Sequence, residues 1–177
     1  MGKYKLNFRE YLKELDKETL IEMLSDAGKN WLAHDGLWFL QVEAGRGMEE
    51  AIKYDKGAWE KFTVIEAKRI MKRHNIPENS GLDGLEKALK YRLYSYINEQ
   101  TIEREGNVLR LYMNNCRVQA ARKRDNRPDF PCKPVGLVEY KYFAKTIDKR
   151  IKTRCICCPP DKHPEEYYCA WEFTIEE

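Results

Sequence analysis

The segment TIEREGNVLRLYMNN (residues 101–115) marks the point at which the hydrophobic pattern of the chain changes. Before it, apolar residues recur at every third or fourth position, which is typical of helices. Within it the period becomes two, which is typical of strands, and Gly106-Asn107 separates two such runs. The segment therefore predicts a β-hairpin that follows a helical region.

Four helices are expected on the N-terminal side of the hairpin. The second is long and extends to the Gly-Arg-Gly segment at 45–47, but Gly28 and Gly36 weaken it, so we expect it to bend or break. The third runs from Met48 to about residue 73. Asp83 and Glu86 form a capping box for the fourth, whose buried stripe includes Leu85, Leu89, Leu93, Tyr96 and Ile97.

The C-terminal side of the hairpin predicts more strands and one helix. CRVQAARKR (116–124) is expected to be a third strand, and RPDFPCKP (127–134) a loop that opens a helix. RIKTRCIC (150–157) and YYCAWEFTIEE (167–177) are the remaining strands. The predicted fold is therefore α+β, with a helical region over residues 1–100 and an antiparallel sheet carrying one helix over residues 101–177. We expect the two regions to form one compact unit.

Composition and charge limit the classes of partner. The 177 residues include 32 Lys and Arg and 29 Asp and Glu, which leaves a net charge of +3. Such a balance does not favour nucleic acid or an anionic membrane as a partner. The sequence shows neither a signal peptide nor an apolar run of membrane-spanning length. We therefore expect a cytoplasmic protein with a small-molecule ligand, and a homo-oligomer is left open.

Four of the six cysteines lie in RCICCPPDKHPEEYYC (154–169). In a reducing compartment they are better interpreted as thiols or metal ligands than as disulfides. Cys155 and Cys158 have the C-x2-C spacing of a metal site, provided that the chain turns at Cys158. The candidate ligands are Cys132, Cys155, Cys158 and Cys169, with Cys116 as a substitute, and the candidate cofactors are zinc and an iron–sulfur cluster. The alternative is that these are buried sulfurs that only pack.

Cys132 is also a candidate nucleophile. It stands at the start of the expected helix after residue 132, where the helix dipole and exposed N–H groups stabilise a thiolate. On a regular strand Cys155 and Cys157 would share one face, and Cys158 would lie on the other.

Two carboxylates fall on apolar helix faces. Asp35 lies four residues after Trp31 and three before Trp38, and Glu66 shares a stripe with Trp59. A carboxylate among aromatic rings has a raised pKa unless it is paired, so both are candidate general acids or bases. The alternative is pairing with an internal arginine. Trp31 and Trp38 are the candidate ligand contacts, together with Arg122 as an anchor for a ligand carboxylate; a solvated strand edge also explains Arg122.

The motifs together resemble a known group of proteins. The segments at 30–62, 130–136 (FPCKPVG), 157–161 (CCPPD) and 169–173 (CAWEF) resemble the L-2-amino-thiazoline-4-carboxylic acid hydrolase-like proteins and, more remotely, 4-vinyl-reductase-type domains. The resemblance implies an α+β fold with helices ahead of a sheet. It places Cys132, Cys158, Asp161 and Cys169 on family positions, whereas Cys155 and Cys157 go beyond the hydrolase-like pattern and favour a metal site.

Two functions follow as hypotheses. The first is a protein that binds a metal or a small ligand through the cysteine cluster. The second is a hydrolase of a small cyclic amidine or amide carboxylate, in which the Cys132 thiolate or a metal-bound water attacks, Asp35 or Glu66 moves protons and Arg122 holds the substrate.

Overall fold

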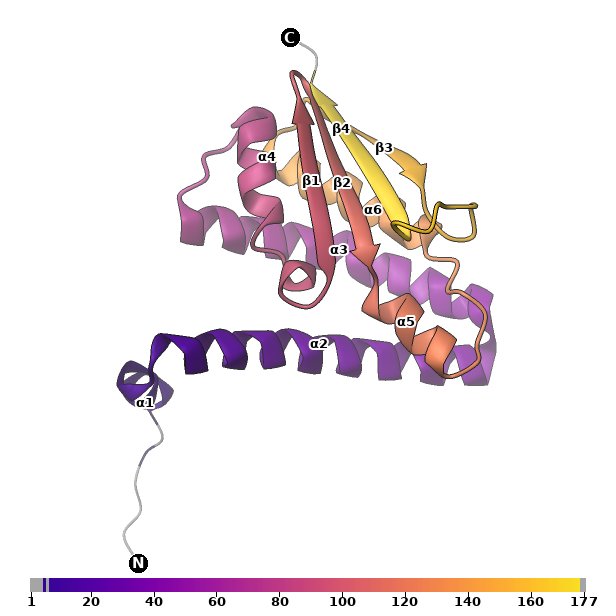
Figure 1. The fold of residues 1–177 in the computed structure, drawn as a ribbon, viewed down its shortest axis with the longest axis horizontal. Helices are drawn as coiled ribbons and strands as arrows, with labels where there is room; N and C mark the ends of the chain where they lie inside the picture. The colour runs from indigo at the N-terminus through magenta and orange to yellow at the C-terminus, as the bar shows by residue number, and fades with distance from the viewer. Residues whose placement is uncertain (1–4, 6, 176–177) are drawn as a thin grey trace, which may run out of the picture.

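Helices form the first half of the molecule, and an antiparallel sheet lies in the second half. The structure is a computed structural model that describes residues 5 and 7–175. The N-terminal helices precede a four-stranded antiparallel sheet (Figure 1), so the predicted α+β class is confirmed. The last two residues of the expected final strand, 176 and 177, lie outside the described residues.

Two long helices form one layer. After the short α1 (Phe8–Glu14), α2 runs over Lys17–Arg46 and α3 over Met48–His74. The expected break in α2 is wrong, because both glycines sit in an unbroken helix. A Cβ on Gly28 would lie 3.1 Å from Cγ2 of Ile97, whereas a Cβ on Gly36 would meet nothing within 4 Å. Gly28 thus allows close packing, and Gly36 faces open space.

The fourth helix is shorter than expected and is capped differently. α4 spans Gly81–Leu89, so the predicted Asp83–Glu86 capping box is wrong. The backbone N–H of Gly81 instead donates to the Asp148 carboxylate at 3.0 Å. The chain then forms a 3-10 turn, η1 (Leu93–Tyr96), rather than a continued helix.

The sheet has the strand order β1-β2-β4-β3. The predicted hairpin is confirmed as β1 (Glu99–Glu105) and β2 (Val108–Asn115), with Gly106 at a φ of +53° in the turn. β4 (Cys169–Ile175) pairs with β2 and with β3 (Ile151–Cys157), always in the antiparallel sense. The final strand therefore lies in the middle of the sheet.

Two helices, not one, belong to the C-terminal half. The segment expected to be a third strand is helix α5 (Arg117–Arg124), so that prediction is wrong. Ala, Arg, Lys and Gln are strong helix formers, and its buried residues Gln119 and Arg122 are three apart. The expected helix after residue 132 is α6 (Lys133–Ile147), with Cys132 at its N-cap.

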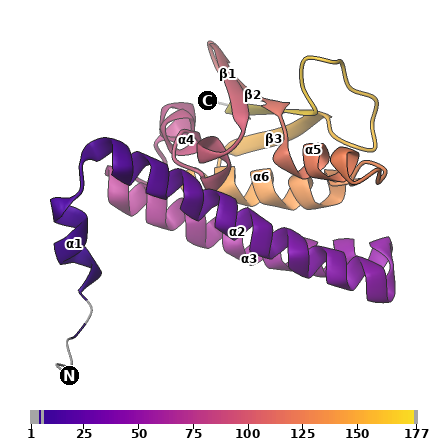
Figure 2. The same cartoon turned by 60° about the horizontal axis from the view of Figure 1, so that its bottom comes forward.

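The elements stack in layers. Figure 2 shows the sheet on one side, α2 and α3 side by side on the other, and α6 between them. The Tyr140 ring of α6 stacks on Trp171 of β4, with centroids 4.6 Å apart. Gly136 permits this contact, because a Cβ there would lie 2.6 Å from the Trp171 ring. None of the helices within the described ranges is long and apolar enough to cross a membrane.

Candidate functional site

A cavity of about 620 Å³ lies where the layers meet. Its walls come from α2, α3, α5, α6 and the adjoining ends of β2 and β4. This volume is within the range of small-molecule sites in proteins. The apolar part of the wall includes Leu32, Phe39, Trp59, Phe130, Val135 and Trp171.

Three helices each contribute one carboxyl group to the wall. Asp35 lies on α2, Asp55 on α3 and Glu139 on α6. Burial raises the pKa of Asp35, and the neighbouring His34 partly offsets this. Burial, together with the charges of Asp35 and Glu139, raises the pKa of Asp55 to about 7. Asp55 can therefore hold or release a proton near neutral pH.

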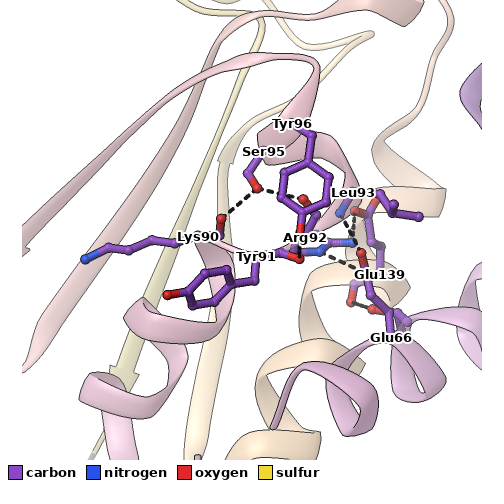
Figure 3. A network of polar contacts seen from close by, with 9 residues as sticks. Glu66, Lys90, Tyr91, Arg92, Leu93, Ser95, Tyr96 and Glu139 are labelled. Carbon is purple, nitrogen blue, oxygen red and sulfur yellow. Dashed lines mark hydrogen bonds and ion pairs between the residues drawn. The ribbon is translucent and has the colours of Figure 1, made fainter. Parts of the chain in front are cut away.

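The third carboxyl group also belongs to a buried ion-pair network. Burial raises the pKa of Glu139 to about 7, although Arg92 opposes the shift. The Arg92 guanidinium lies 2.7 Å from Glu139 and 3.0 Å from Glu66, and Figure 3 shows these three side chains together. Glu66 also accepts a hydrogen bond of 3.0 Å from the backbone N–H of Leu93. The Arg92 guanidinium thus forms ion pairs with two buried carboxylates.

Thiols line another part of the same cavity. The Sγ atoms of Cys132 and Cys158 are 3.5 Å apart, and the Cys158 thiol also hydrogen-bonds with Cys169. Cys116 lies on the same wall. All of these cysteines carry free thiols. The hydrogen bonds to Cys132 and Cys169, and burial, raise the pKa of the Cys158 thiol well above its usual range, and burial raises that of Cys116 to about 12.

A family model matches residues 13–175, and its description is "Family of unknown function (DUF6125)". The chain belongs to the DUF6125 family. No curated protein and no solved structure matches it. Membership in DUF6125 names no substrate, so the similarity to the thiazoline carboxylic acid hydrolase-like proteins stays a hypothesis, and the site of this DUF6125 protein has to be interpreted from its own residues.

The predicted metal ligands come together only in part. Cys132, Cys158 and Cys169 meet at the cavity wall, as expected. The expected alternation of Cys155 and Cys157 is wrong, because a bulge between them pairs Cys155 with Trp171 and Cys157 with Ala170. Ala170 and Trp171 are adjacent on β4, so their side chains point to opposite faces of the sheet, and so do those of the cysteines that pair with them. Cys155 therefore lies on the same face of the sheet as Trp171 and Cys169, although it is not part of the cavity wall, and Cys157 lies on the opposite face.

No group of three or more His, Cys, Asp or Glu side chains in residues 5 and 7–175 is arranged to hold a metal ion. The predictions of zinc and of an iron–sulfur cluster thus stay predictions.

The residues predicted to bind and hydrolyse a small organic substrate are also brought together only in part. Asp35, Arg122 and Cys132 all lie on the cavity wall. Arg122, however, makes a bidentate ion pair with Glu43 at 2.8 and 3.0 Å, and its Nε donates to the carbonyl of Pro128. Its guanidinium is therefore already engaged by a carboxylate of the chain itself.

The remaining predicted residues lie elsewhere. Glu66 pairs with Arg92, which is the alternative that the sequence left open. Trp31 packs in an aromatic cluster, stacked on Phe62 with centroids 5.7 Å apart. Trp38 is 65% exposed and is not part of the cavity wall, so the helix face that it was expected to share with Asp35 is not buried at Trp38.

Two residues of the site were missed by sequence reasoning, Asp55 and Glu139. Asp55 lies four residues before Trp59, on the same helical stripe. Glu139 lies four residues after Val135 and four before Phe143. The spacing that singled out Asp35 could therefore have found both, because each is a carboxylate on an apolar helix face.

Proposed function

We propose that this protein binds a small organic molecule in the cavity between α2, α3, α5, α6 and the sheet. The observation that carries the proposal is the cavity of about 620 Å³ itself, which combines an aromatic wall with convergent carboxyl and thiol groups. Pockets of this size, mainly apolar with a few polar groups, are typical ligand sites.

Gly36 allows the proposal to be tested by filling the cavity. It lies on the cavity wall, in the middle of α2, and a Cβ there would meet nothing within 4 Å. Gly36→Leu should therefore place a side chain in the space that a ligand needs. Gly57→Leu is the matched control, because Gly57 is also helical and unobstructed but lies on the exposed surface of α3.

The measurement is isothermal titration calorimetry with 1-naphthalenemethanol, a neutral aromatic probe. We expect saturable binding of one molecule per chain to the wild type and to Gly57→Leu, and loss of binding in Gly36→Leu. Both substitutions improve helix propensity by about 0.8–1 kcal/mol, so both variants should remain folded in a thermal unfolding scan. Equal binding by the two variants, or no saturable binding to the wild type, would contradict the proposal.

A second candidate is a thiolate metal site, which the thiol cluster supports. Cys132, Cys158 and Cys169 are in contact, and the charges of Cys132 and Cys169 act on Cys116, the substitute ligand of the sequence analysis. Zinc–sulfur bonds of about 2.3 Å place two thiolates about 3.8 Å apart. The Cys132–Cys158 separation of 3.5 Å is close to that value.

Elemental analysis and a visible absorption spectrum of protein purified without oxygen test this candidate. We expect one zinc per chain, or an iron–sulfur band, that Cys158→Ser removes and Cys157→Ser retains. Cys157 is the control because it pairs with Ala170 and so points to the face of the sheet opposite to that of Cys169 and Trp171. A folded wild-type protein without metal would rule this candidate out. Hydrolysis of a carboxylate substrate has less support, because Arg122, the expected anchor for that carboxylate, is already paired with Glu43.

A further inference from the structure

A second cavity, of about 550 Å³, lies at the C-terminal end of α3. It is separate from the cavity described above, because no residue lines both. Its wall includes Arg69, Lys72, Arg73 and His74 of α3, together with Tyr91 and Tyr96. Among the described residues, no carboxylate lines it. The volume is within the range of small-molecule sites, and the charge of the wall suits an anion.

The three charged residues of the wall lie on one face of α3. Lys72 and Arg73 follow Arg69 by three and four residues, the spacing that brings side chains together on a helix. Like charges at this spacing destabilise a helix. Lys53 of the same helix pairs with Glu50 at 3.0 Å, but within residues 5 and 7–175 none of the three wall cations has an ion-pair partner. Helix stability therefore does not explain this arrangement.

The helix dipole does not account for the three cations either. The C-terminal end of a helix carries about half a negative elementary charge, and its effect falls off within the last turn. Arg69 lies five residues before the last residue of α3, His74, and thus beyond that turn. The carbonyl of His74 also already accepts a hydrogen bond of 2.9 Å from the Lys87 ammonium group. The positive charge of the wall thus exceeds what the helix end compensates.

Another part of the wall is aromatic and fixed by contacts of its own. The His74 ring stacks on Tyr91 with centroids 3.5 Å apart. The Tyr96 hydroxyl donates to the backbone carbonyl of Tyr91 at 3.0 Å, and the Ser95 hydroxyl donates to that of Lys90 at 2.8 Å, as Figure 3 shows. A wall that is ordered before a ligand arrives lowers the entropy cost of binding.

We infer that this second cavity binds the phosphate groups of a small organic molecule. Arg69 and Arg73 supply planar guanidinium groups, whose N–H donors match the oxygens of a phosphate, and Lys72 adds a third charge. A phosphate carries up to about two negative charges near neutral pH, so it compensates these cations better than a single carboxylate does. Tyr91 and Tyr96 face the same cavity and contact the organic part of the ligand. The inference goes beyond the proposed function, because it concerns a separate site.

Calorimetric titration with ADP, pyrophosphate and adenosine tests the inference. ADP and pyrophosphate each carry a diphosphate, whereas adenosine is uncharged. For the wild type at pH 8 and low salt, we expect one molecule of either diphosphate to bind per chain, and no saturable binding of adenosine. High salt should weaken binding of the diphosphates at least about tenfold, because salt screens exposed charges.

Variants of the wall arginines assign the binding to this cavity. Arg69→Gln and Arg73→Gln should each weaken diphosphate binding at least about tenfold. Arg46→Gln is the matched control, because Arg46 is also an exposed cation in the last turn of a long helix, α2, but lies outside the cavity. It should leave binding unchanged. Arginine and glutamine have similar helix propensities, so all three variants should remain folded in a thermal unfolding scan.

The outcomes separate this inference from its rivals and from the proposed function. No saturable binding of either diphosphate overturns it, and so does equal binding by the two cavity variants and Arg46→Gln. If a short single-stranded RNA binds and neither diphosphate does, the cations serve a nucleic acid, and the inference is also overturned. Gly36→Leu, which fills the other cavity, should leave diphosphate binding unchanged; loss of binding in that variant would place the diphosphate there instead.

Discussion

Asp55 shows how three helices together change the chemistry of one side chain. On α3 alone, Asp55 would be an ordinary carboxylate near the helix surface. The packing of α2 and α6 against α3 adds burial and two further carboxyl groups, Asp35 and Glu139, and raises its pKa to about 7. A hydrogen bond from Trp59 only partly offsets this. A buried carboxyl group that is costly to ionise is a common feature of functional sites.

We predict that Asp55→Asn stabilises the protein at pH 8 and leaves it unchanged near pH 4. The pKa of Asp55 is raised from 3.8 to about 7 on folding, so its contribution to stability is present below the lower value and is lost as pH rises toward 7. Asparagine carries no charge and avoids this loss. We expect a gain of about 1–3 kcal/mol in the free energy of unfolding at pH 8.

Urea unfolding followed by tryptophan fluorescence at the two pH values measures this difference. Asp26→Asn is the control and should have no pH-dependent gain, because Asp26 is an exposed carboxylate on α2. An equal effect of Asp55→Asn at both pH values would show that Asp55 does not titrate as described.

At the scale of elements, local periodicity predicted the hairpin, α6 and the last two strands. The prediction is correct for these segments because their apolar residues recur at the period of the helix or strand and face one layer of the molecule. β4 is an example, because Trp171 and Phe173 lie two residues apart, so they share one face of the sheet, and both are buried.

α5 shows where the sequence was insufficient. Four of its eight residues are charged, and its buried residue Gln119 is held by the loop that follows the helix. The Gln119 side chain accepts from the backbone N–H of Phe130 at 2.9 Å and donates to its carbonyl at 2.8 Å. Since this loop contact fixes the inward face of α5, the alternation of the segment alone could not distinguish a helix from a strand.

The site was predicted less completely than the fold, for a related reason. The helical spacing that selected Asp35 also applies to Asp55 and Glu139, but no local pattern shows that three carboxylates from α2, α3 and α6 face one cavity. In the same way, the sequence could not show the bulge that separates Cys155 from Cys157. Both facts depend on how elements that are distant in the chain pack together.

At the scale of the whole molecule, Arg92 connects the layers. It is 2% exposed and pairs with Glu66 of α3 and Glu139 of α6. Its guanidinium also lies over the Phe143 ring, 4.6 Å from the centroid. Because Glu139 is also part of the cavity wall, this network links the cavity to the packing of α3 against α6.

We predict that Arg92→Leu destabilises the protein by about 3–5 kcal/mol, because it leaves two buried carboxyl groups without their cation. The loss should be larger at pH 8 than at pH 5.5, since burial raises the pKa of Glu139 to about 7 and the group is protonated at the lower pH. Arg154→Leu is the control: Arg154 pairs with Glu172 at 2.8 Å, but its side chain is 66% exposed. Such surface pairs contribute about 0–1 kcal/mol.

A triple variant separates the loss of the cation from the loss of packing. When Glu66→Gln and Glu139→Gln are added to Arg92→Leu, no unpaired charge remains, so most of the pH dependence of the unfolding free energy should disappear and part of the stability should return. The measurement is urea unfolding, at pH 5.5 and pH 8, of the wild type, Arg92→Leu, the control Arg154→Leu and the triple variant. If the triple variant is as unstable at pH 8 as Arg92→Leu alone, the arginine acts through its contacts with the surrounding rings rather than through its charge.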